Sequence, residues 1–304
     1  FNKFFILLIF FIYSINGFIN TYIKNDNINL KTNIKKNNNI NFVIWKGFSI
    51  PSINYIKFGK SIINEGLKNN ININITICKN YNLPILNNTI LFGHSSGGYH
   101  CLNSNNDNLK AKITYGSSPI SVYDNTIFKI KNKLDIDTLN IIGEYDGFLS
   151  YYKLLDQKIY NIENNIKNNK LICTKSNHLC IAENKKTLIS TLLCMYDHKL
   201  NSNYNIMTKN VINVIISYIL YLKDNNIKIH NSKYTENIFT KNIIFEVDNY
   251  KHFLRTKPDK CKTYMYIDYN KNNTYIKTAG IFGDMLLDKL ENEIKEVKNT
   301  LSWL

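Results

Sequence analysis

A serine flanked by glycines is the residue of this chain whose surroundings best suit covalent chemistry. Residues 93–98 read GHSSGG, which places Ser95 in the pattern G-x-S-x-G. The apolar run TILF precedes the pattern at 89–92, and helical spacing follows it at about 97–104. In a strand, turn and helix of this kind the turn is so sharp that it excludes bulky neighbours and exposes the serine hydroxyl above the sheet. The pattern predicts an activated nucleophile, with an ordinary Gly/Ser turn as the alternative.

Two further loops hold residues that could activate a serine. The apolar run at 139–142 leads to Asp146 in an Asp-Gly turn, with Glu144 as the near alternative for the carboxylate. The apolar run at 171–174 leads to His178, and none of the other five histidines follows a strand-like run outside the serine turn. A histidine can take the serine proton while a carboxylate fixes its tautomer. A turn-forming aspartate and a lone histidine are the alternatives.

These segments together resemble the α/β-hydrolase family. The resemblance covers residues 40 to about 223 and rests on the serine turn, the Asp-Gly turn and the Asn-His pair, in the family's order of nucleophile, acid and histidine. It implies that Ser95, Asp146 and His178 form a catalytic triad. It implies no metal or organic cofactor.

The family also needs two backbone N–H groups that bind the oxyanion of the tetrahedral intermediate. The resemblance assigns the first to Ser96, the residue after the nucleophile. The second comes from the loop after the strand at 40–45, where Lys46-Gly47-Phe48 matches the family's glycine-containing turn. We expect Phe48 to supply this N–H, with Gly47 as the alternative.

From residue 40 onward, short apolar runs alternate with amphipathic stretches, which predicts parallel βα units. The fold class is therefore α/β, a mainly parallel sheet flanked by helices. The expected strands cover 40–45, 71–78, 89–92, 111–115, 139–142 and 170–174, and the expected helices cover 54–67, 97–104, 149–160, 183–195 and 206–222. The connection at 79–88 is shorter than a usual parallel crossover, so its helix should be missing or reduced to a turn. No insertion that could form a lid domain separates Asp146 from the strand at 170–174.

The N-terminal residues are interpreted as two segments outside the α/β domain, which spans 40–225. Residues 1–17 contain an apolar run at 4–15, too short for the about 20 residues of a membrane span but typical of a signal peptide. A buried strand or helix is the alternative. Residues 18–39, rich in Asn and Lys, are interpreted as a basic linker that packs poorly. The signal-like segment predicts that the protein enters the secretory pathway. Its destination is then secretion, an endomembrane or a secondary plastid.

The C-terminal residues, 226–304, are interpreted as a small extension of unknown role. They offer β-prone runs at 242–247 and 263–269 and a charged amphipathic helix at 285–301.

Net charge and cysteines point to no further function class. The chain carries a formal charge of +15, but its lysines are dispersed and Arg255 is the single arginine, which argues against specific nucleic-acid binding. Six cysteines form no C-x-x-C pair, so no zinc pattern is present. The cysteines could form up to three disulfides or could be small buried hydrophobic residues, and the sequence leaves both interpretations open.

The function expected from these patterns is hydrolysis of a carboxylic ester through an acyl-enzyme on Ser95. The GHSSGG turn resembles the lipase-type turns of chlorophyllases and lipid hydrolases, which favours a lipid or other apolar ester as substrate, with peripheral membrane contact left open. The competing hypothesis is a binding protein that kept the fold without catalysis. The oligomeric state is left open.

Overall fold

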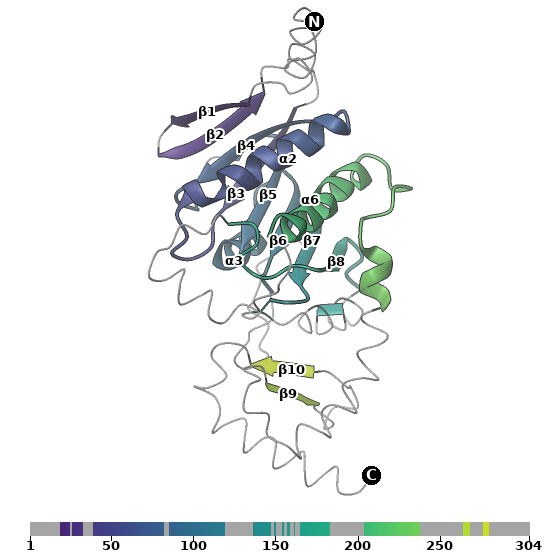
Figure 1. Cartoon of the computed structure of the whole chain (residues 1–304). Helices are drawn as coiled ribbons and strands as arrows, with labels where there is room; N and C mark the ends of the chain where they lie inside the picture. Colours follow the sequence, from purple (N-terminus) through teal and green to yellow (C-terminus); the bar gives the residue numbers. More distant parts are fainter. Residues whose placement is uncertain are drawn as a thin grey trace, which may run out of the picture.

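An eight-stranded sheet with helices on both faces forms the main part of the protein (Figure 1). The computed structural model describes residues 19–24, 26–32, 39–81, 85–118, 136–146, 165–182 and 204–237, five single positions from 149 to 161, and the backbone of 264–267 and 276–279. Within these ranges, no helix is both long and apolar enough to cross a membrane.

The sheet is mainly parallel, as the alternation of strands and helices predicts. Its order is β1-β2-β4-β3-β5-β6-β7-β8, in which β3 to β8 run parallel and β1 and β2 run antiparallel to their neighbours. This is the α/β-hydrolase fold expected from the serine turn. The strands are β1 (Ile19–Lys24), β2 (Asn27–Thr32), β3 (Asn39–Trp45), β4 (Asn72–Cys78), β5 (Thr89–His94), β6 (Leu109–Tyr115), β7 (Asp137–Gly143) and β8 (Asn169–Thr174).

Helices cover the two faces of the sheet in an arrangement set by the alternation of side chains along its strands. One face packs against two mutually contacting helices, α2 (Ile56–Lys68) and α6 (Tyr204–Tyr221). The other face packs against α3 (Ser96–Asn103), whose Cys101 contacts the cluster formed by Val43, Trp45 and Leu91. The 3-10 helix η1 (Ser52–Tyr55) leads into α2.

Several expected elements have definite outcomes. The helices at 54–67, 97–104 and 206–222 are confirmed. The described parts of the β4–β5 connection, 79–81 and 85–88, contain bends and a turn but no helix, in agreement with its short length. The run at 263–269 contains β9 (Tyr264–Ile267), which pairs with an unpredicted strand, β10 (Ile276–Ala279). The stretches 1–17, 183–195, 242–247 and 285–301 lie outside the described residues, and the signal-like segment therefore stays a prediction.

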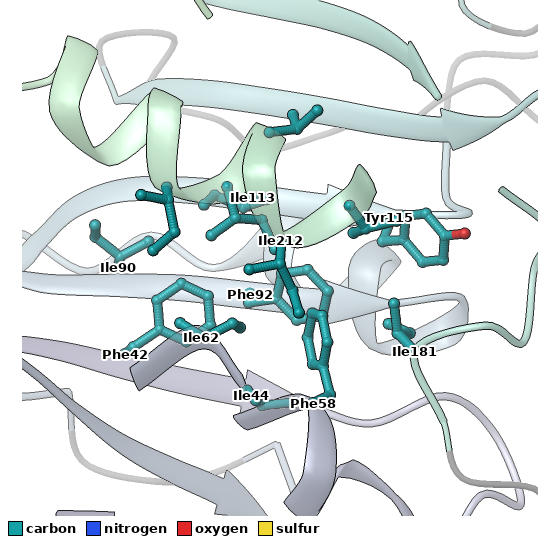
Figure 2. Packing of buried hydrophobic residues seen from close by; sticks show 14 of the residues in the cluster. Phe42, Ile44, Phe58, Ile62, Ile90, Phe92, Ile113, Tyr115, Ile181 and Ile212 are labelled. Atoms are coloured by element: carbon teal, nitrogen blue, oxygen red, sulfur yellow. The ribbon is translucent and has the colours of Figure 1, made fainter. Parts of the chain in front are cut away.

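Aromatic and branched side chains fill the layer between the sheet and the α2–α6 pair (Figure 2). Phe92 of β5 lies at its centre, with its ring centroid 5.9 Å from that of Phe42 and 5.5 Å from that of Phe58. Ile62 of α2 and Ile212 of α6 pack on the same cluster. This layer anchors β5, whose last residue precedes Ser95.

Four of the six cysteines are buried with free thiols: Cys78, Cys101, Cys173 and Cys180. Burial raises the pKa of the Cys78 and Cys101 thiols to about 12. These four therefore behave as small buried hydrophobic residues rather than as partners in disulfides. Cys194 and Cys261 lie outside the described residues.

The interpretation of residues 18–39 as a poorly packed linker is wrong for residues 19–32. They form the β1–β2 hairpin, which adds to the sheet when β2 pairs antiparallel with β4. Leu30 is fully buried against α2, since a Cβ placed on Gly59 would lie 2.6 Å from its Cδ1. The Asn-rich composition hid the alternation of Ile28 and Leu30, which is the pattern of a strand with one buried face.

Asparagines are tolerated in β2 because their side chains bond to the neighbouring strand. The Thr76 hydroxyl donates to Asn29 Oδ1 at 3.0 Å, and the Lys79 backbone N–H donates to Asn27 Oδ1 at 3.0 Å. The domain therefore begins at or before Ile19 rather than at residue 40.

Shortening Leu30 should destabilise the whole domain. Leu30→Ala removes a fully buried side chain and leaves a cavity beside Gly59, which should lower the free energy of unfolding by about 2–5 kcal/mol. Urea titration followed by circular dichroism measures this loss. Ile23→Ala in the same hairpin is the control, because Ile23 is 73% exposed and should change stability little. Equal midpoints for the two variants would contradict the packing of β2.

Candidate active site

The three residues expected to form a triad lie beyond the carboxyl ends of neighbouring parallel strands. Ser95 follows β5, Asp146 lies three residues after β7, and His178 lies four residues after β8. Between β5 and β7 in the sheet lies β6, which ends at Tyr115 and is followed by Gly116. Ligands of open α/β sheets bind at this edge, because the loops that follow parallel strands converge there.

The turn around Ser95 has the strained geometry expected of a nucleophile elbow. Ser95 has φ 53° and ψ −121°, a conformation that costs about 1–3 kcal/mol in residues other than glycine. The flanking glycines allow the close approach of backbone segments: a Cβ on Gly93 would lie 2.4 Å from the Gly97 carbonyl oxygen, and one on Gly97 would lie 2.4 Å from the Trp45 carbonyl oxygen. The requirement for small flanking residues is confirmed.

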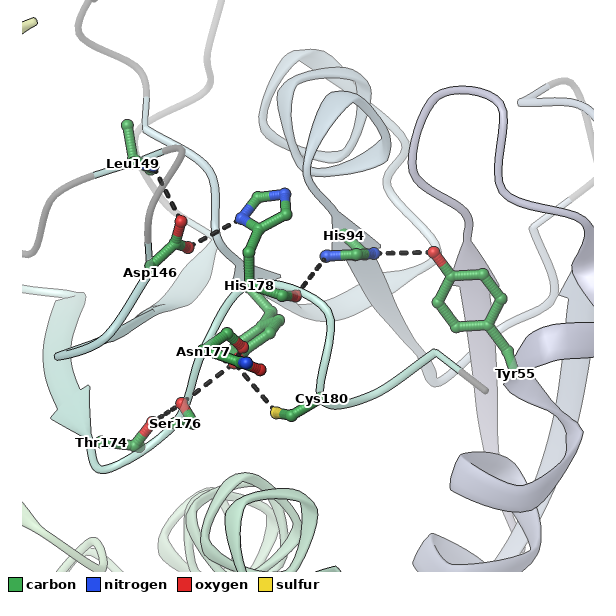
Figure 3. A network of polar contacts seen from close by, with 10 residues as sticks. Tyr55, His94, Asp146, Leu149, Thr174, Ser176, Asn177, His178 and Cys180 are labelled. Carbon is green, nitrogen blue, oxygen red and sulfur yellow. Dashed lines mark hydrogen bonds and ion pairs between the residues drawn. The ribbon is translucent and has the colours of Figure 1, made fainter. Parts of the chain in front are cut away.

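Asp146 and His178 form a buried pair (Figure 3). His178 Nδ1 lies 2.7 Å from Asp146 Oδ2, with 6% and 0% of the two side chains exposed. The Leu149 backbone N–H donates to Asp146 Oδ1 at 2.8 Å. A carboxylate can only accept, so Nδ1 carries the proton, and in the neutral ring Nε2 is left as an acceptor. An imidazole held in this tautomer can take a proton at Nε2.

The alternative carboxylate, Glu144, is directed elsewhere. Its Oε2 accepts a hydrogen bond from the Tyr234 hydroxyl. Asp146 is thus the carboxylate at His178 in the described part of the site. Asp124, between β6 and β7 in the chain, lies outside the described residues.

Gly116 allows the histidine and aspartate to approach the strand beside Ser95. The Ser95 N–H donates to the Tyr115 carbonyl at 2.9 Å, so the elbow is bonded to the residue just before Gly116. A Cβ on Gly116 would lie 2.7 Å from His178 Nδ1 and 3.1 Å from Asp146 Oδ2. No motif in the sequence singled out Gly116, although a glycine directly after a buried strand was the available signal.

Tyr115 bonds to the loop that carries His178. The Tyr115 hydroxyl donates to the Asn177 carbonyl and lies 2.9 Å from Ser176 Oγ. Burial raises the pKa of Tyr115 well above its usual value, so the hydroxyl keeps its proton and can donate.

The two backbone segments expected to bind an oxyanion lie against Ser95. Ser96 is the first residue of α3, where an N–H has no acceptor within the helix. A Cβ on Gly47 would lie 3.4 Å from Ser95 Cβ, which places the loop after β3 beside the serine. The Gly47 N–H itself donates to the Tyr55 hydroxyl at 2.9 Å and is therefore occupied. Phe48 remains the candidate donor of this loop.

Two buried residues of the site are signalled by no catalytic motif of the sequence. His94 and Tyr55 are both fully buried, and Tyr55 Oη lies 2.7 Å from His94 Nδ1 (Figure 3). No motif signalled Tyr55, because it is 39 residues away from its partner in the chain. Among the described residues, no three His, Cys, Asp or Glu side chains gather as a metal site requires.

Comparison with known proteins gives structural likenesses at low identity. The sequence matches no protein-family model and no curated protein. A predicted CIB-like hydrolase from Thermoplasma acidophilum is 14% identical, with 59% of this chain and 97% of that chain covered and a TM-score of 0.38. An esterase from Pyrococcus furiosus is 12% identical, with 61% of this chain and 95% of that chain covered and a TM-score of 0.38. The Francisella virulence factor BioJ is 16% identical, with 70% of this chain and 90% of that chain covered and a TM-score of 0.38.

A side chain at position 116 should disturb the histidine and aspartate pair. Gly116 has φ 58°, so Gly116→Ala combines about 1–2 kcal/mol of backbone strain with a clash at His178. The free energy of unfolding should fall clearly more than in Asn70→Ala, a control with φ 56° in an exposed turn. Thermal and urea unfolding of both variants measure the difference. Equal losses would mean that His178 does not occupy the space beside Gly116.

Proposed function

We propose that this protein is a serine hydrolase that cleaves carboxylic esters through an acyl-enzyme on Ser95. The observation that supports it best is the buried contact of 2.7 Å between His178 Nδ1 and Asp146 Oδ2, at the same edge of the sheet as the strained Ser95. A binding protein has no need of a buried carboxylate and imidazole, since burying such groups without a chemical use is costly.

In the first half of the reaction, Ser95 Oγ attacks the ester carbonyl carbon while His178 Nε2 takes the hydroxyl proton. Asp146 keeps the ring in the required tautomer and stabilises the imidazolium. The tetrahedral intermediate collapses when the bond to the alcohol oxygen breaks, and the imidazolium gives its proton to that leaving oxygen. Ser95 is then esterified by the acyl group.

In the second half, water replaces the alcohol. His178 Nε2 takes a proton from the water, whose oxygen attacks the acyl carbon, and returns the proton to Ser95 Oγ as the acid leaves. The negative charge of both tetrahedral intermediates falls on the former carbonyl oxygen. The N–H groups of Ser96 and Phe48 are the proposed donors to it, and one such donor contributes about 3–4 kcal/mol.

An apolar acyl or alcohol group is the proposed substrate feature. Phe48 is 75% exposed and Ile53 is 46% exposed, and both belong to the segment between β3 and α2 that passes Ser95. Exposed apolar side chains on a segment that passes the nucleophile favour a lipid or another apolar ester over a charged one. They also suit peripheral contact with a membrane surface, and a chlorophyllase-like substrate belongs to this class.

Ser95 should react with a fluorophosphonate, which labels activated serines independently of substrate. Ser95→Ala should abolish the labelling and the turnover of p-nitrophenyl butyrate, because no other group supplies the nucleophile. Gel fluorescence and release of p-nitrophenol measure the two. Ser61→Ala on α2 is the control and should behave as the unmodified protein. Labelling that persists in Ser95→Ala would assign the nucleophile to another serine.

The acid is tested by replacing each candidate carboxylate with its amide. Asp146→Asn should lower kcat by about 10⁴, because the amide favours the wrong tautomer of His178. Glu144→Gln should change kcat little, since its carboxylate accepts from Tyr234. The steady-state rate per folded molecule distinguishes the two. A larger loss in Glu144→Gln than in Asp146→Asn would reverse the assignment.

A further inference from the structure

Two tyrosine hydroxyls hold one peptide unit of the loop after β3, at both of its ends. The Gly47 N–H donates to Tyr55 Oη at 2.9 Å. The Tyr81 hydroxyl donates to the Lys46 carbonyl at 3.1 Å. These N–H and carbonyl groups belong to the same peptide bond, so its plane is fixed from opposite sides.

The same hydroxyls also reach the residues that flank the nucleophile. Tyr55 Oη lies 2.7 Å from His94 Nδ1, and Tyr81 Oη lies 3.3 Å from Ser96 Oγ. His94 directly precedes Ser95 and Ser96 directly follows it. The peptide next to the proposed oxyanion donor is thus connected to both sides of the nucleophile.

The protons of the chain through His94 have a single consistent arrangement. His94 Nε2 lies 3.0 Å from the His178 carbonyl oxygen, which can only accept, so Nε2 carries the proton. Burial, and then the proximity of His178, lower the pKa of His94 well below its usual value, so the ring is neutral and Nδ1 is an acceptor. Tyr55 must then donate to Nδ1 and accept from Gly47. Each of these buried polar atoms is satisfied.

We propose that Tyr55 and His94 are positioning residues of the esterase site, an inference that rests on the proposed function. Tyr55 holds the Lys46–Gly47 peptide so that the next N–H, that of Phe48, stays directed at the oxyanion, while His94 fixes the main chain of His178 (Figure 3). One chain of hydrogen bonds therefore fixes the position of the Phe48 loop relative to that of His178.

The loop needs such external bonds because its own backbone is permissive. Gly47 has no Cβ to restrict its torsion angles, and Phe48 and Ser49 form a turn with φ 57° at Ser49. The hydrogen bond that closes this turn, from the Ile50 N–H to the Gly47 carbonyl, is long at 3.3 Å. A donor stabilises a developing charge best when it is held in place before the reaction.

His94 acts on His178 through the main chain and not as a second base. It bonds the His178 carbonyl oxygen, whereas the His178 ring bonds Asp146. A proton transferred along this chain would end on a carbonyl and leave His94 Nε2 without its donor function. Positioning is the role that the geometry supports.

Tyr55→Phe removes the hydroxyl and keeps the ring, and it is the variant that tests the proposal. Tyr218→Phe is the matched control, because Tyr218 is equally buried and its hydroxyl has no partner among the described residues. Each protein is titrated for active sites with the fluorophosphonate, so that rates are expressed per reactive site and misfolded molecules do not count. We then measure kcat and KM for p-nitrophenyl butyrate and Kd for butylboronic acid, which forms a tetrahedral adduct on serine.

In Tyr55→Phe, kcat should fall about tenfold to a hundredfold, because a displaced oxyanion donor is felt in the transition state. Kd for the boronic acid should rise by a similar factor while KM stays within twofold. His94→Phe, which keeps an aromatic ring but removes both ring nitrogens from the chain, should show the same split. The kcat of the double variant should be no lower than that of the less active single variant, because the two residues act in one chain of hydrogen bonds.

A rate per site in Tyr55→Phe within twofold of Tyr218→Phe would overturn the positioning role while leaving the esterase intact. A rise in KM with unchanged kcat would also overturn the positioning role, since it would indicate altered substrate binding. If the unmodified protein neither reacts with the fluorophosphonate nor hydrolyses the ester, the proposed function fails and the positioning role fails with it.

Discussion

The close approach of the helix after Ser95 to the end of β3 is the constraint on which the rest of the site depends. A Cβ on Gly97 would lie 2.4 Å from the Trp45 carbonyl oxygen and 2.6 Å from that of Lys46, so only glycine permits this packing. The first turn of α3 is thereby brought to the loop that begins at Lys46. The strained turn at Ser95 and the proximity of two backbone segments that could bind an oxyanion both follow from this one contact.

Strain at Ser95 persists because the elements on either side of it are held independently. β5 is paired on both edges, with β3 and β6, and its buried Phe92 packs against α2. On the other side, α3 buries Cys101 against the opposite face of the sheet. A cost of about 1–3 kcal/mol at one residue is small against the burial of several large side chains, each of which contributes about 1.5–3 kcal/mol. The core thus stabilises a turn that its own backbone preferences oppose.

Sequence patterns predicted those features that local chemistry decides. The elbow was recognisable because its small residues sit at fixed spacing, and Asp146 and His178 because each follows a buried apolar run. The β1–β2 hairpin was missed because its stability comes from pairing with β4, 40 or more residues away, and its composition resembles that of a linker. A glycine directly after a buried strand marked Gly116, but its role beside His178 depends on which strand ends become neighbours, as does the bond between Tyr55 and His94. No local spacing encodes that.

The support for His178 illustrates how these long-range contacts act together. Consecutive carbonyls of its loop accept from two different buried side chains, that of Asn177 from Tyr115 and that of His178 from His94. Asp146 then fixes the ring from a third direction through Nδ1. With the main chain bonded at two adjacent points and the ring at one nitrogen, little torsional freedom remains about the side chain. An imidazole held in this way needs little reorganisation before it accepts a proton, which is what the proposed role of a general base requires.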